Sequence, residues 1–307
     1  MELVRGSSNI AARHRGAIVT IGSFDGLHRG HQALIAATVQ RARAADRAAL
    51  MLTFEPMPRE FLQTDPPARL TNFRERWRCL ATSGLDALVL LRFDAKLRAT
   101  RGADFLQLLQ RELAVAGVVV GHDFRFGREG EADAAFLAAA GERLGFVVEV
   151  VPPVVGEGER VSSSALRAAL QTGDFDRAAR LLGRRYAMRG RVVAGQQLGR
   201  TLGFPTANIR LRRRRIPLGG IFAVRVRGID GTVRAGVASL GTRPTVGGVE
   251  PLLETFVFDF EGDLYGRELE VEFVARLRGE ERFESLDELV VQMHADERAA
   301  RVALGMI

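Results

Sequence analysis

Residues 22–31 read Gly22-Ser23-Phe24-Asp25-Gly26-Leu27-His28-Arg29-Gly30-His31, and they connect an apolar run, Ala17–Phe24, to a helical pattern, Gln32–Ala44. A strand that enters a helix through a glycine-rich turn predicts a βα unit. Glycine lets the backbone approach a ligand closely, and the first turn of a helix offers N–H groups and the positive end of the helix dipole. The stretch therefore predicts a phosphate-binding site at the start of a helix.

The two histidines of this stretch are its most informative side chains. His28 and His31 are three residues apart, so they share one helix face and can both donate hydrogen bonds to a single phosphoryl group. Two other roles compete with phosphate binding. Metal ligation needs a third ligand at a suitable spacing, which this stretch lacks. Plain capping of the helix remains open.

Outward from this stretch, residues 17–151 alternate short apolar runs with longer helical patterns, which is typical of a parallel sheet in an α/β domain. Asn72 and Glu75 have the spacing of a capping pair at the start of one of these helices. The expected strands are Ala17–Phe24, Ala48–Phe54, Ala87–Phe93, Gly117–Gly121 and Phe146–Val151, and the expected helices are Gln32–Ala44, Phe73–Thr82, Ala103–Leu113 and Ala132–Leu144.

The pattern changes after Gly183. Two further helices precede it, Ser164–Gln171 and Phe175–Leu182, and short extended runs with frequent glycines and turn signals follow it. This pattern predicts an antiparallel barrel or sandwich closed by one terminal helix, and hence domains at residues 1–183 and 184–307. The expected strands are Arg189–Ala194, Ile221–Val226, Val233–Leu240, Leu252–Phe260 and Leu269–Ala275, and the terminal helix is Leu286–Ala303.

Composition limits the class of protein more than it identifies it. The chain has 307 residues, of which 47% are hydrophobic and 26% charged, as in ordinary globular proteins of about two domains. The single cysteine, Cys79, cannot form an internal disulfide, and no long apolar run occurs, so we expect a cytoplasmic protein without a membrane segment.

The net charge of +7 comes almost entirely from arginine, with Lys96 the only lysine. Because the arginines are spread along the chain, we expect no nucleic-acid partner. The one dense run, Arg212–Arg215, is expected to form a solvated loop.

A second motif lies in the barrel-like half. Residues 195–208 supply glycines for a close-fitting loop and then Thr206 and Asn208. If residues 206–208 are extended, the side chains of Thr206 and Asn208 point the same way, so their two side-chain oxygens face one ligand. Such oxygens suit Mg²⁺ carried by ATP. Thr-x-Asn alone is a weak signal, because turns also contain both residues.

Glu254 is the candidate general base. Strand alternation places it on one face with Phe256, Phe258 and Phe260. A carboxylate beside apolar side chains is desolvated, which raises its pKa and favours proton acceptance. A glutamate that simply reaches water at the rim of the sheet is the alternative.

The first motif resembles the HxGH nucleotidylyltransferases, and in particular the FMN adenylyltransferase half of prokaryotic bifunctional riboflavin kinase/FMN adenylyltransferases, also called FAD synthetases. Matching strings follow in order at residues 53–56, 121–127 and 162–167, whereas Ser23, Met57 and Arg128 to Asp133 depart from the usual pattern. The resemblance implies a Rossmann-like domain with ATP-phosphate contacts from Gly22, Phe24, Asp25, Gly26, His28, Gly30, His31, Ser162, Ser163, Ser164 and Arg167, and flavin contacts from Asp123, Phe124 and Phe126. Ser162 to Ser164 can equally be an N-cap before Leu166.

The string Leu202-Gly203-Phe204-Pro205-Thr206-Ala207-Asn208 resembles the riboflavin kinase signature, and Leu253-Glu254-Thr255 resembles the segment around that family's catalytic base. The resemblance implies that riboflavin, ATP and Mg²⁺ give FMN and ADP, and that FMN and ATP then give FAD and pyrophosphate. It implies ATP contacts from Gly195, Leu202, Gly203, Pro205, Thr206 and Asn208, Mg²⁺ ligands Thr206 and Asn208, and flavin contacts from Arg278 and Phe283.

Two competing hypotheses remain at this point. One is a nucleotidylyltransferase whose barrel only binds flavin. The other is a nucleic-acid or flavin-binding protein without turnover, motivated by the net charge of +7. The oligomeric state is not predicted.

Overall fold

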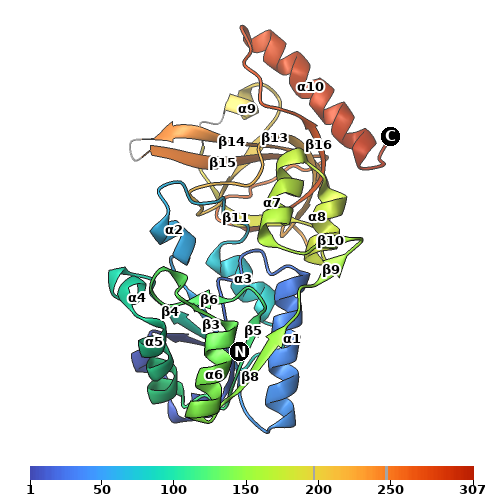
Figure 1. Cartoon of the computed structure of the whole chain (residues 1–307). Helices are drawn as coiled ribbons and strands as arrows, with labels where there is room; N and C mark the ends of the chain where they lie inside the picture. The colour runs from blue at the N-terminus through green and yellow to red at the C-terminus, as the bar shows by residue number, and fades with distance from the viewer. Residues whose placement is uncertain (196–197, 246–247) are drawn as a thin grey trace. The chain divides into compact units, whose positions relative to one another are not determined.

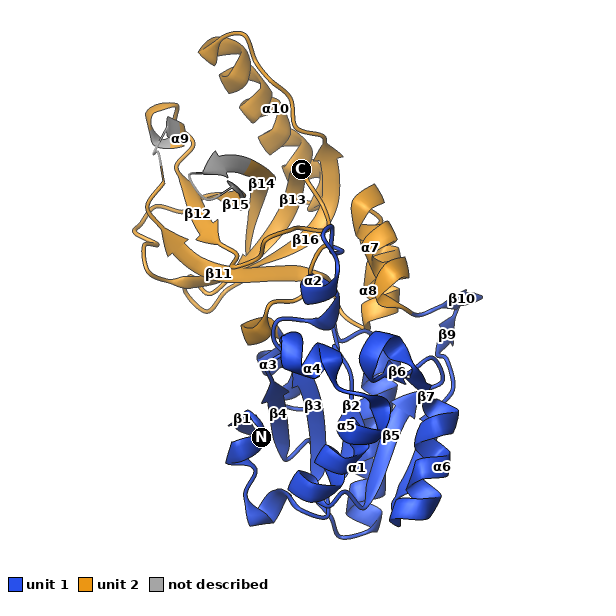
Figure 2. Ribbon diagram, turned by 60° about the vertical axis from the view of Figure 1, so that its left-hand side comes forward, with its two compact units in different colours: residues 1–67, 76–161 blue, residues 68–75, 162–307 orange. Residues whose placement is uncertain are grey.

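The computed structural model describes residues 1–195, 198–245 and 248–307, without the side chains of 198, 200, 243–245 and 248–250. The chain forms two compact units. Unit 1 contains residues 1–67 and 76–161, and unit 2 contains residues 68–75 and 162–307 (Figure 2). Unit 2 therefore includes a short segment, residues 68–75, from the N-terminal half of the sequence. The predicted domain boundary near Gly183 stays a prediction.

Unit 1 is built on a parallel sheet with helices on its faces, as the alternating pattern predicted (Figure 1). The strand order is β1-β4-β3-β2-β5-β8. The strands are β1 Glu2–Arg5, β2 Ile18–Ile21, β3 Ala49–Phe54, β4 Ala87–Leu91, β5 Gly117–Gly121 and β8 Val147–Val151, and the helices are α1 Arg29–Ala44, α2 Pro58–Leu62, α3 Phe73–Leu80, α4 Ala95–Ala99, α5 Gly102–Leu108 and α6 Ala134–Leu144.

The burial of the central strands explains why the apolar runs in the sequence predicted them correctly. Every residue of β2, β3 and β4 is buried, as expected for parallel strands covered on both faces. Edge strand β1 was not predicted, because it is four residues long and includes Glu2 and Arg5. The predicted helix Ala103–Leu113 continues beyond α5 as a π-helical turn, Leu109–Leu113, which ends at Ala114 in a left-handed conformation.

The order of the strands also determines where a ligand would bind. The chain runs from β2 outward through β3 and β4, and then returns to the other side of β2 with β5. In open α/β sheets, ligands bind at the carboxyl ends of the strands where the order reverses in this way. The loop after β2 leads to His28, which caps α1, and to His31 in the first turn of α1, and residues 122–127 follow β5, so both predicted segments lie at this switch point.

Unit 2 is a closed antiparallel barrel of order β11-β12-β15-β14-β13-β16, accompanied by helices. The predicted barrel is confirmed, and strand β12, which was not predicted outright, extends over Thr206–Arg210. The other elements are α7 Ser163–Thr172, α8 Phe175–Leu182, β11 Ala187–Val193, α9 Leu198–Thr201, β13 Gly220–Arg227, β14 Arg234–Thr245, β15 Gly248–Val257, β16 Glu268–Arg278 and α10 Leu286–Ala303.

One expectation about unit 2 is wrong. Arg213, in the arginine run expected to be a solvated loop, has a fully buried side chain that forms an ion pair with Glu75. Its guanidinium also donates to the Tyr186 hydroxyl (3.0 Å) and to the Leu70 carbonyl (3.0 Å). Glu75 in turn accepts a hydrogen bond from the Arg189 N–H and forms the predicted capping pair with Asn72. Arg213 thus anchors the segment 68–75, whereas Arg212, Arg214 and Arg215 are exposed.

Among the described residues, no helix is long and apolar enough to cross a membrane.

Candidate active sites

The histidine pair of unit 1 lies at the beginning of α1. His28 is the N-cap residue, and its Nδ1 accepts a hydrogen bond from the His31 N–H at 3.3 Å. The two imidazole rings stack with their centroids 3.7 Å apart and their planes 18° apart. The capping role and the pairing on one face, treated as alternatives from sequence, therefore occur together.

His31 lies in an environment that keeps its ring neutral. Burial, the neighbouring His28 ring and the positive charge of Arg76 hold the pKa of His31 well below its usual range. The Nδ1 atom of His31 is buried and has no hydrogen-bond partner within the part of the chain that the structure describes. A buried polar atom without a partner costs free energy until a ligand or water satisfies it. A neutral imidazole with an unsatisfied nitrogen suits hydrogen bonding to a phosphate.

Glycines stand where the loop closely approaches the rings. A Cβ atom at Gly30 would lie 3.2 Å from the ring of His28, and a Cβ atom at Gly22 would lie 3.2 Å from the ring of Phe24. Gly26 has a φ of +87°, which glycine adopts readily. Asp25 is buried within the same loop. The loop thus packs closely around the aromatic rings.

The residues predicted to contact flavin follow β5. Phe124 is half-buried and stacks on Phe126, with ring centroids 5.3 Å apart. Phe126 itself belongs to the hydrophobic core of unit 1 and packs against Phe105. The Asp123 carboxylate accepts a hydrogen bond from Arg160 at 2.5 Å, and both side chains are exposed. Flavin contact by Asp123, Phe124 and Phe126 stays a prediction.

The serine-rich segment and Arg167 belong to unit 2. Ser162 is the N-cap of α7, and its hydroxyl accepts a hydrogen bond from the Ala165 N–H at 3.1 Å. The Arg167 Nε donates to the Ala68 carbonyl at 2.6 Å, within the same unit. The alternative capping role of Ser162 is thus observed. Phosphate contact by Ser162, Ser163, Ser164 and Arg167 stays a prediction.

The kinase candidate site is a row of residues across three strands. Glu254 on β15 is directly opposite Asn208 on β12 and Ser239 on β14. Directly opposite residues in antiparallel strands have side chains on the same face, with Cβ atoms about 4.5–5.5 Å apart. The barrel therefore places the predicted magnesium ligand Asn208 beside the predicted base Glu254. Thr206 is opposite Phe256, one pair further along the same face.

Glycine packs against both predicted magnesium ligands. A Cβ atom at Gly195 would lie 2.3–2.5 Å from the side-chain amide of Asn208, and one at Gly199 would lie 3.4 Å from Thr206 Oγ1. Any side chain at Gly195 would displace that amide. The glycines thus leave room for the oxygen-bearing groups, as a close-fitting nucleotide loop requires. No cluster of three or more His, Cys, Asp or Glu side chains that could hold a metal occurs within the described ranges. The donor set fits an ion that also binds ATP phosphates and water.

Glu254 shares a face of β15 with Phe256, as strand alternation predicts, but β15 ends at Val257, so Phe258 and Phe260 lie beyond the strand. Its neighbours Leu253 and Thr255 are completely buried, whereas Glu254 is half-buried on the opposite face with Phe256. The ring of Phe256 contacts Phe204 and Phe258, with centroid distances of 5.2 and 5.8 Å. Phe204 lies within the string at residues 202–208, where Gly203 has a φ of +83° before Pro205. This string therefore packs on the same face as the carboxylate.

The two residues predicted to contact riboflavin are in contact with each other. The guanidinium of Arg278 lies over the Phe283 ring, 5.7 Å from its centroid. It also forms two hydrogen bonds to Asp296 of α10, at 2.8 and 2.7 Å, which raise the pKa of Arg278. Asp296 is buried and was not predicted, because nothing in a helical sequence indicates which carboxylate faces the barrel. The ion pair determines the direction in which Arg278 points.

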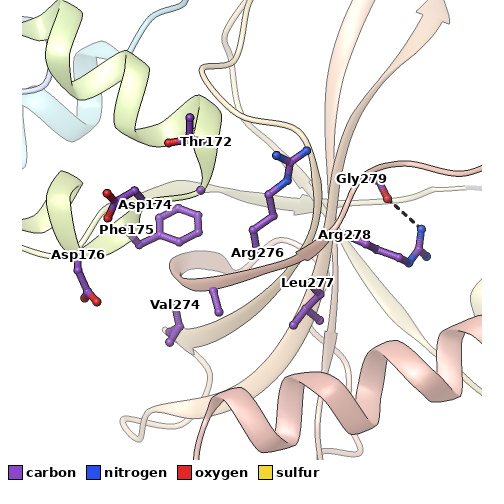
Figure 3. A pocket seen from close by; sticks show the side chains of 11 residues that line it. Thr172, Asp174, Phe175, Asp176, Val274, Arg276, Leu277, Arg278 and Gly279 are labelled. Carbon is purple, nitrogen blue, oxygen red and sulfur yellow. Dashed lines mark hydrogen bonds between the residues drawn. The ribbon is translucent and has the colours of Figure 1, made fainter.

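A pocket of about 660 Å³ lies between the α7–α8 turn and the end of β16 (Figure 3). The stem of the Arg276 side chain lies beside Gly173 of the α7–α8 turn, whereas Arg278 points away from this turn. Sequence reasoning did not find this pocket, because it forms between distant segments. Its lining residues are 172–176 and 274–279.

The fold and the two sites define an enzyme class, namely transferases that use ATP to modify another substrate. Residues 10–165 match the family model of FAD synthetase, and residues 182–304 match that of riboflavin kinase. The bifunctional riboflavin kinase/FMN adenylyltransferase of Escherichia coli (strain K12) is 43% identical, covering 100% of this chain and 99% of that relative. This chain belongs to the bifunctional riboflavin kinase/FMN adenylyltransferase family. It phosphorylates riboflavin to FMN and adenylylates FMN to FAD, with ATP as the co-substrate of both reactions.

A second relative has the same name, and one solved structure with a different name shares the fold. A bifunctional riboflavin kinase/FMN adenylyltransferase from Pseudomonas fluorescens is 46% identical, covering 98% of this chain and 97% of that relative. A crystal structure named as a macrolide-efflux protein from Streptococcus pneumoniae has a TM-score of 0.82 and 31% identity, covering 98% of this chain and 99% of that chain. The riboflavin kinase match argues against a barrel that only binds flavin.

Proposed function

We propose that Glu254 is the general base of riboflavin phosphorylation. The riboflavin 5′-hydroxyl oxygen attacks the γ-phosphorus of ATP, the bond to the bridging oxygen breaks, and ADP leaves. Glu254 accepts the hydroxyl proton. The row Asn208, Glu254 and Ser239 carries this proposal, because it places a carboxylate beside an oxygen donor on one sheet face.

Thr206 and Asn208 would hold the magnesium ion that accompanies ATP in this reaction. When bound, such an ion neutralises charge on the transferred phosphate. The side-chain oxygens of Thr206 and Asn208 position the nucleotide through it, and Gly195 keeps the space beside the Asn208 amide open. Arg278, held by Asp296, would orient riboflavin together with Phe283.

In FAD formation, we propose that an FMN phosphate oxygen attacks the α-phosphorus of ATP and that pyrophosphate leaves. His28 and His31 of unit 1 donate hydrogen bonds to the phosphates. For Ser162 to Ser164 and Arg167 we propose a phosphate-binding role as well, on the resemblance of residues 162–167 alone. Donors that are already in place stabilise the charge that develops during transfer. The buried and unsatisfied Nδ1 of His31 supports this role.

We also propose an adenylyltransferase domain at residues 1–183 and a kinase domain at residues 184–307. Residues 68–75 would then pack on the kinase domain, although they precede it in the sequence. Because ATP is made inside the cell, a cytoplasmic location is proposed, without a nucleic-acid partner.

Separate loss of each activity tests these roles. The full-length protein is incubated with riboflavin, ATP and MgCl₂, and the flavins are separated by chromatography over time; FMN should appear before FAD. Combined His28→Ala and His31→Ala substitutions should abolish FAD formation and leave FMN formation intact. Glu254→Ala should block FMN formation and still convert supplied FMN to FAD. Loss of both activities in either folded variant would contradict two independent sites.

A further inference from the structure

Arg76 of α3 is a buried charge that the sequence did not single out. Its side chain is 2% exposed, and unit 1 contains both it and its partners. Its Nη1 donates to the Ser23 carbonyl at 2.8 Å, and its Nη2 donates to the Glu55 carboxylate at 2.7 Å. Ser23 follows β2 and Glu55 follows β3. One planar guanidinium therefore connects the carboxyl ends of two neighbouring strands, which the single donor point of a lysine could not do equally well.

The Ser23 carbonyl immediately precedes a backbone conformation that needs support. Phe24 has a φ of +50°, in the left-handed region, which is unfavourable for a residue with a Cβ atom. Such residues persist only where the surrounding structure holds them in place. The Phe24 side chain is buried, and the hydrogen bond from Arg76 fixes the peptide group on its N-terminal side.

Phe24 in turn contacts the histidine pair. Its ring meets His31 edge-on, with centroids 5.2 Å apart and planes 64° apart. His31 stacks on His28, which caps α1. A continuous series of contacts thus leads from Arg76 through Ser23 and Phe24 to both imidazoles.

Burial of Arg76 is not explained by stability alone. Removing a guanidinium from water costs several kcal/mol, and an apolar side chain of similar volume is often as stabilising. The charged guanidinium of Arg76 instead serves to hold the Ser23 carbonyl and the Glu55 carboxylate in place.

We propose that Arg76 is a positioning residue of the adenylyltransferase site, which fixes the Ser23–Phe24 backbone and thereby the orientation of His28 and His31. The inference rests on the proposed role of these histidines in FAD formation. A donor that is misplaced by about 1 Å can cost about 100-fold in rate. Because positioned donors act mainly on the transition state, the loss should appear in kcat rather than in KM.

The test compares Arg76→Met, Arg76→Lys and Arg41→Met in the full chain, using FMN and ATP as substrates. Arg41→Met is the matched control, since Arg41 also pairs with a glutamate, Glu149, at 2.5 Å, but at the far end of α1. We expect Arg76→Met to lower kcat of FAD formation about 100-fold with KM nearly unchanged. Arg76→Lys should recover part of the loss, and Arg41→Met should match the unaltered protein. Riboflavin phosphorylation by the same protein serves as the internal control of folding.

Three results would overturn the inference. These are an unchanged kcat in Arg76→Met, an effect confined to KM for ATP, and no difference between the methionine and lysine variants. If Arg76→Met does not fold, Glu55→Gln provides the test, because Glu55 is partly exposed and supports the guanidinium; its kcat should fall about tenfold with kinase activity intact. His28→Ala with His31→Ala is measured in the same series. No loss there would refute the proposed histidine role, whereas a loss there without one in the Arg76 and Glu55 variants would refute only the role of Arg76.

Discussion

The two candidate sites of this enzyme are assembled in opposite ways. The histidine pair comes from ten consecutive residues, in which a loop and the first turn of α1 bring His28 onto His31. The kinase row needs three strands, because Asn208, Ser239 and Glu254 meet only through the pairing of β12, β14 and β15. A local site depends on the conformation of one loop, whereas a site of paired strands depends on barrel register. The two sites should therefore respond to different kinds of damage.

The largest expected effect is on the stability of unit 2, when the buried ion pair between Arg213 and Glu75 is removed. Arg213→Met would leave the buried Glu75 carboxylate without its ion-pair partner, which typically costs about 3–5 kcal/mol. We expect the urea concentration at the midpoint of unfolding, monitored by the loss of kinase activity, to be markedly lower. The control is Arg234→Met, which removes a more exposed pair with Asp230 and should cost at most about 1 kcal/mol. Equal midpoints for the two variants would show that barrel stability does not depend on residues 68–75.

The next effect tests the nonlocal site alone. Gly195→Ala would place a Cβ atom 2.3–2.5 Å from the Asn208 amide, so that amide must move from its present position. We expect riboflavin phosphorylation to fall about 100-fold, by the misplacement of a nucleotide-positioning group. FAD formation from supplied FMN should not change. Gly219→Ala is the matched control, because its nearest contact would be an ordinary 3.5 Å. An active Gly195→Ala variant would remove Asn208 from the proposed site.

A smaller effect tests the local site. Gly30→Ala would bring a Cβ atom to 3.2 Å from the His28 ring, a contact that a shift of a few tenths of an ångström can relieve. We expect FAD formation to fall about tenfold, less than the full loss for a misplaced donor, with kinase activity unaffected. Gly156→Ala, in open space within unit 1, serves as the control. A loss of kinase activity in Gly30→Ala would contradict the separation of the sites.

The smallest effect concerns pH. Because the pKa of His31 is lowered in the folded protein, the unfolded chain binds a proton below about pH 6.5 that the folded chain does not. Stability is therefore lost as the pH falls below 6.5 toward the folded pKa, with a slope of at most about 1.4 kcal/mol per pH unit from this group. Denaturant unfolding of unit 1 at pH 5 and pH 7 measures it. His31→Asn should flatten this difference, and an unchanged difference would show that His31 is not responsible.

Sequence reasoning succeeded where the information is local. The parallel sheet followed from apolar runs such as residues 49–54, which are buried throughout, and the capping pair Asn72–Glu75 followed from its spacing. Sequence reasoning failed at β1, because a four-residue strand with two charged residues gives no apolar pattern. It also failed at Arg213, which the sequence did not distinguish from the three neighbouring surface arginines. Buried arginines and exposed arginines have the same local sequence signature, because burial depends on what packs against them.

The sequence by itself determined the two fold classes, the histidine pair and the string that ends at Asn208, because periodicity, glycine spacing and capping act over a few residues. Only the tertiary structure decided that Ser239 lies beside Glu254, that Asp296 directs Arg278, and that Arg76 holds the backbone next to the histidines. Each of these contacts joins residues far apart in the chain. Their formation depends on strand register and side-chain burial, which arise only when the whole unit has folded.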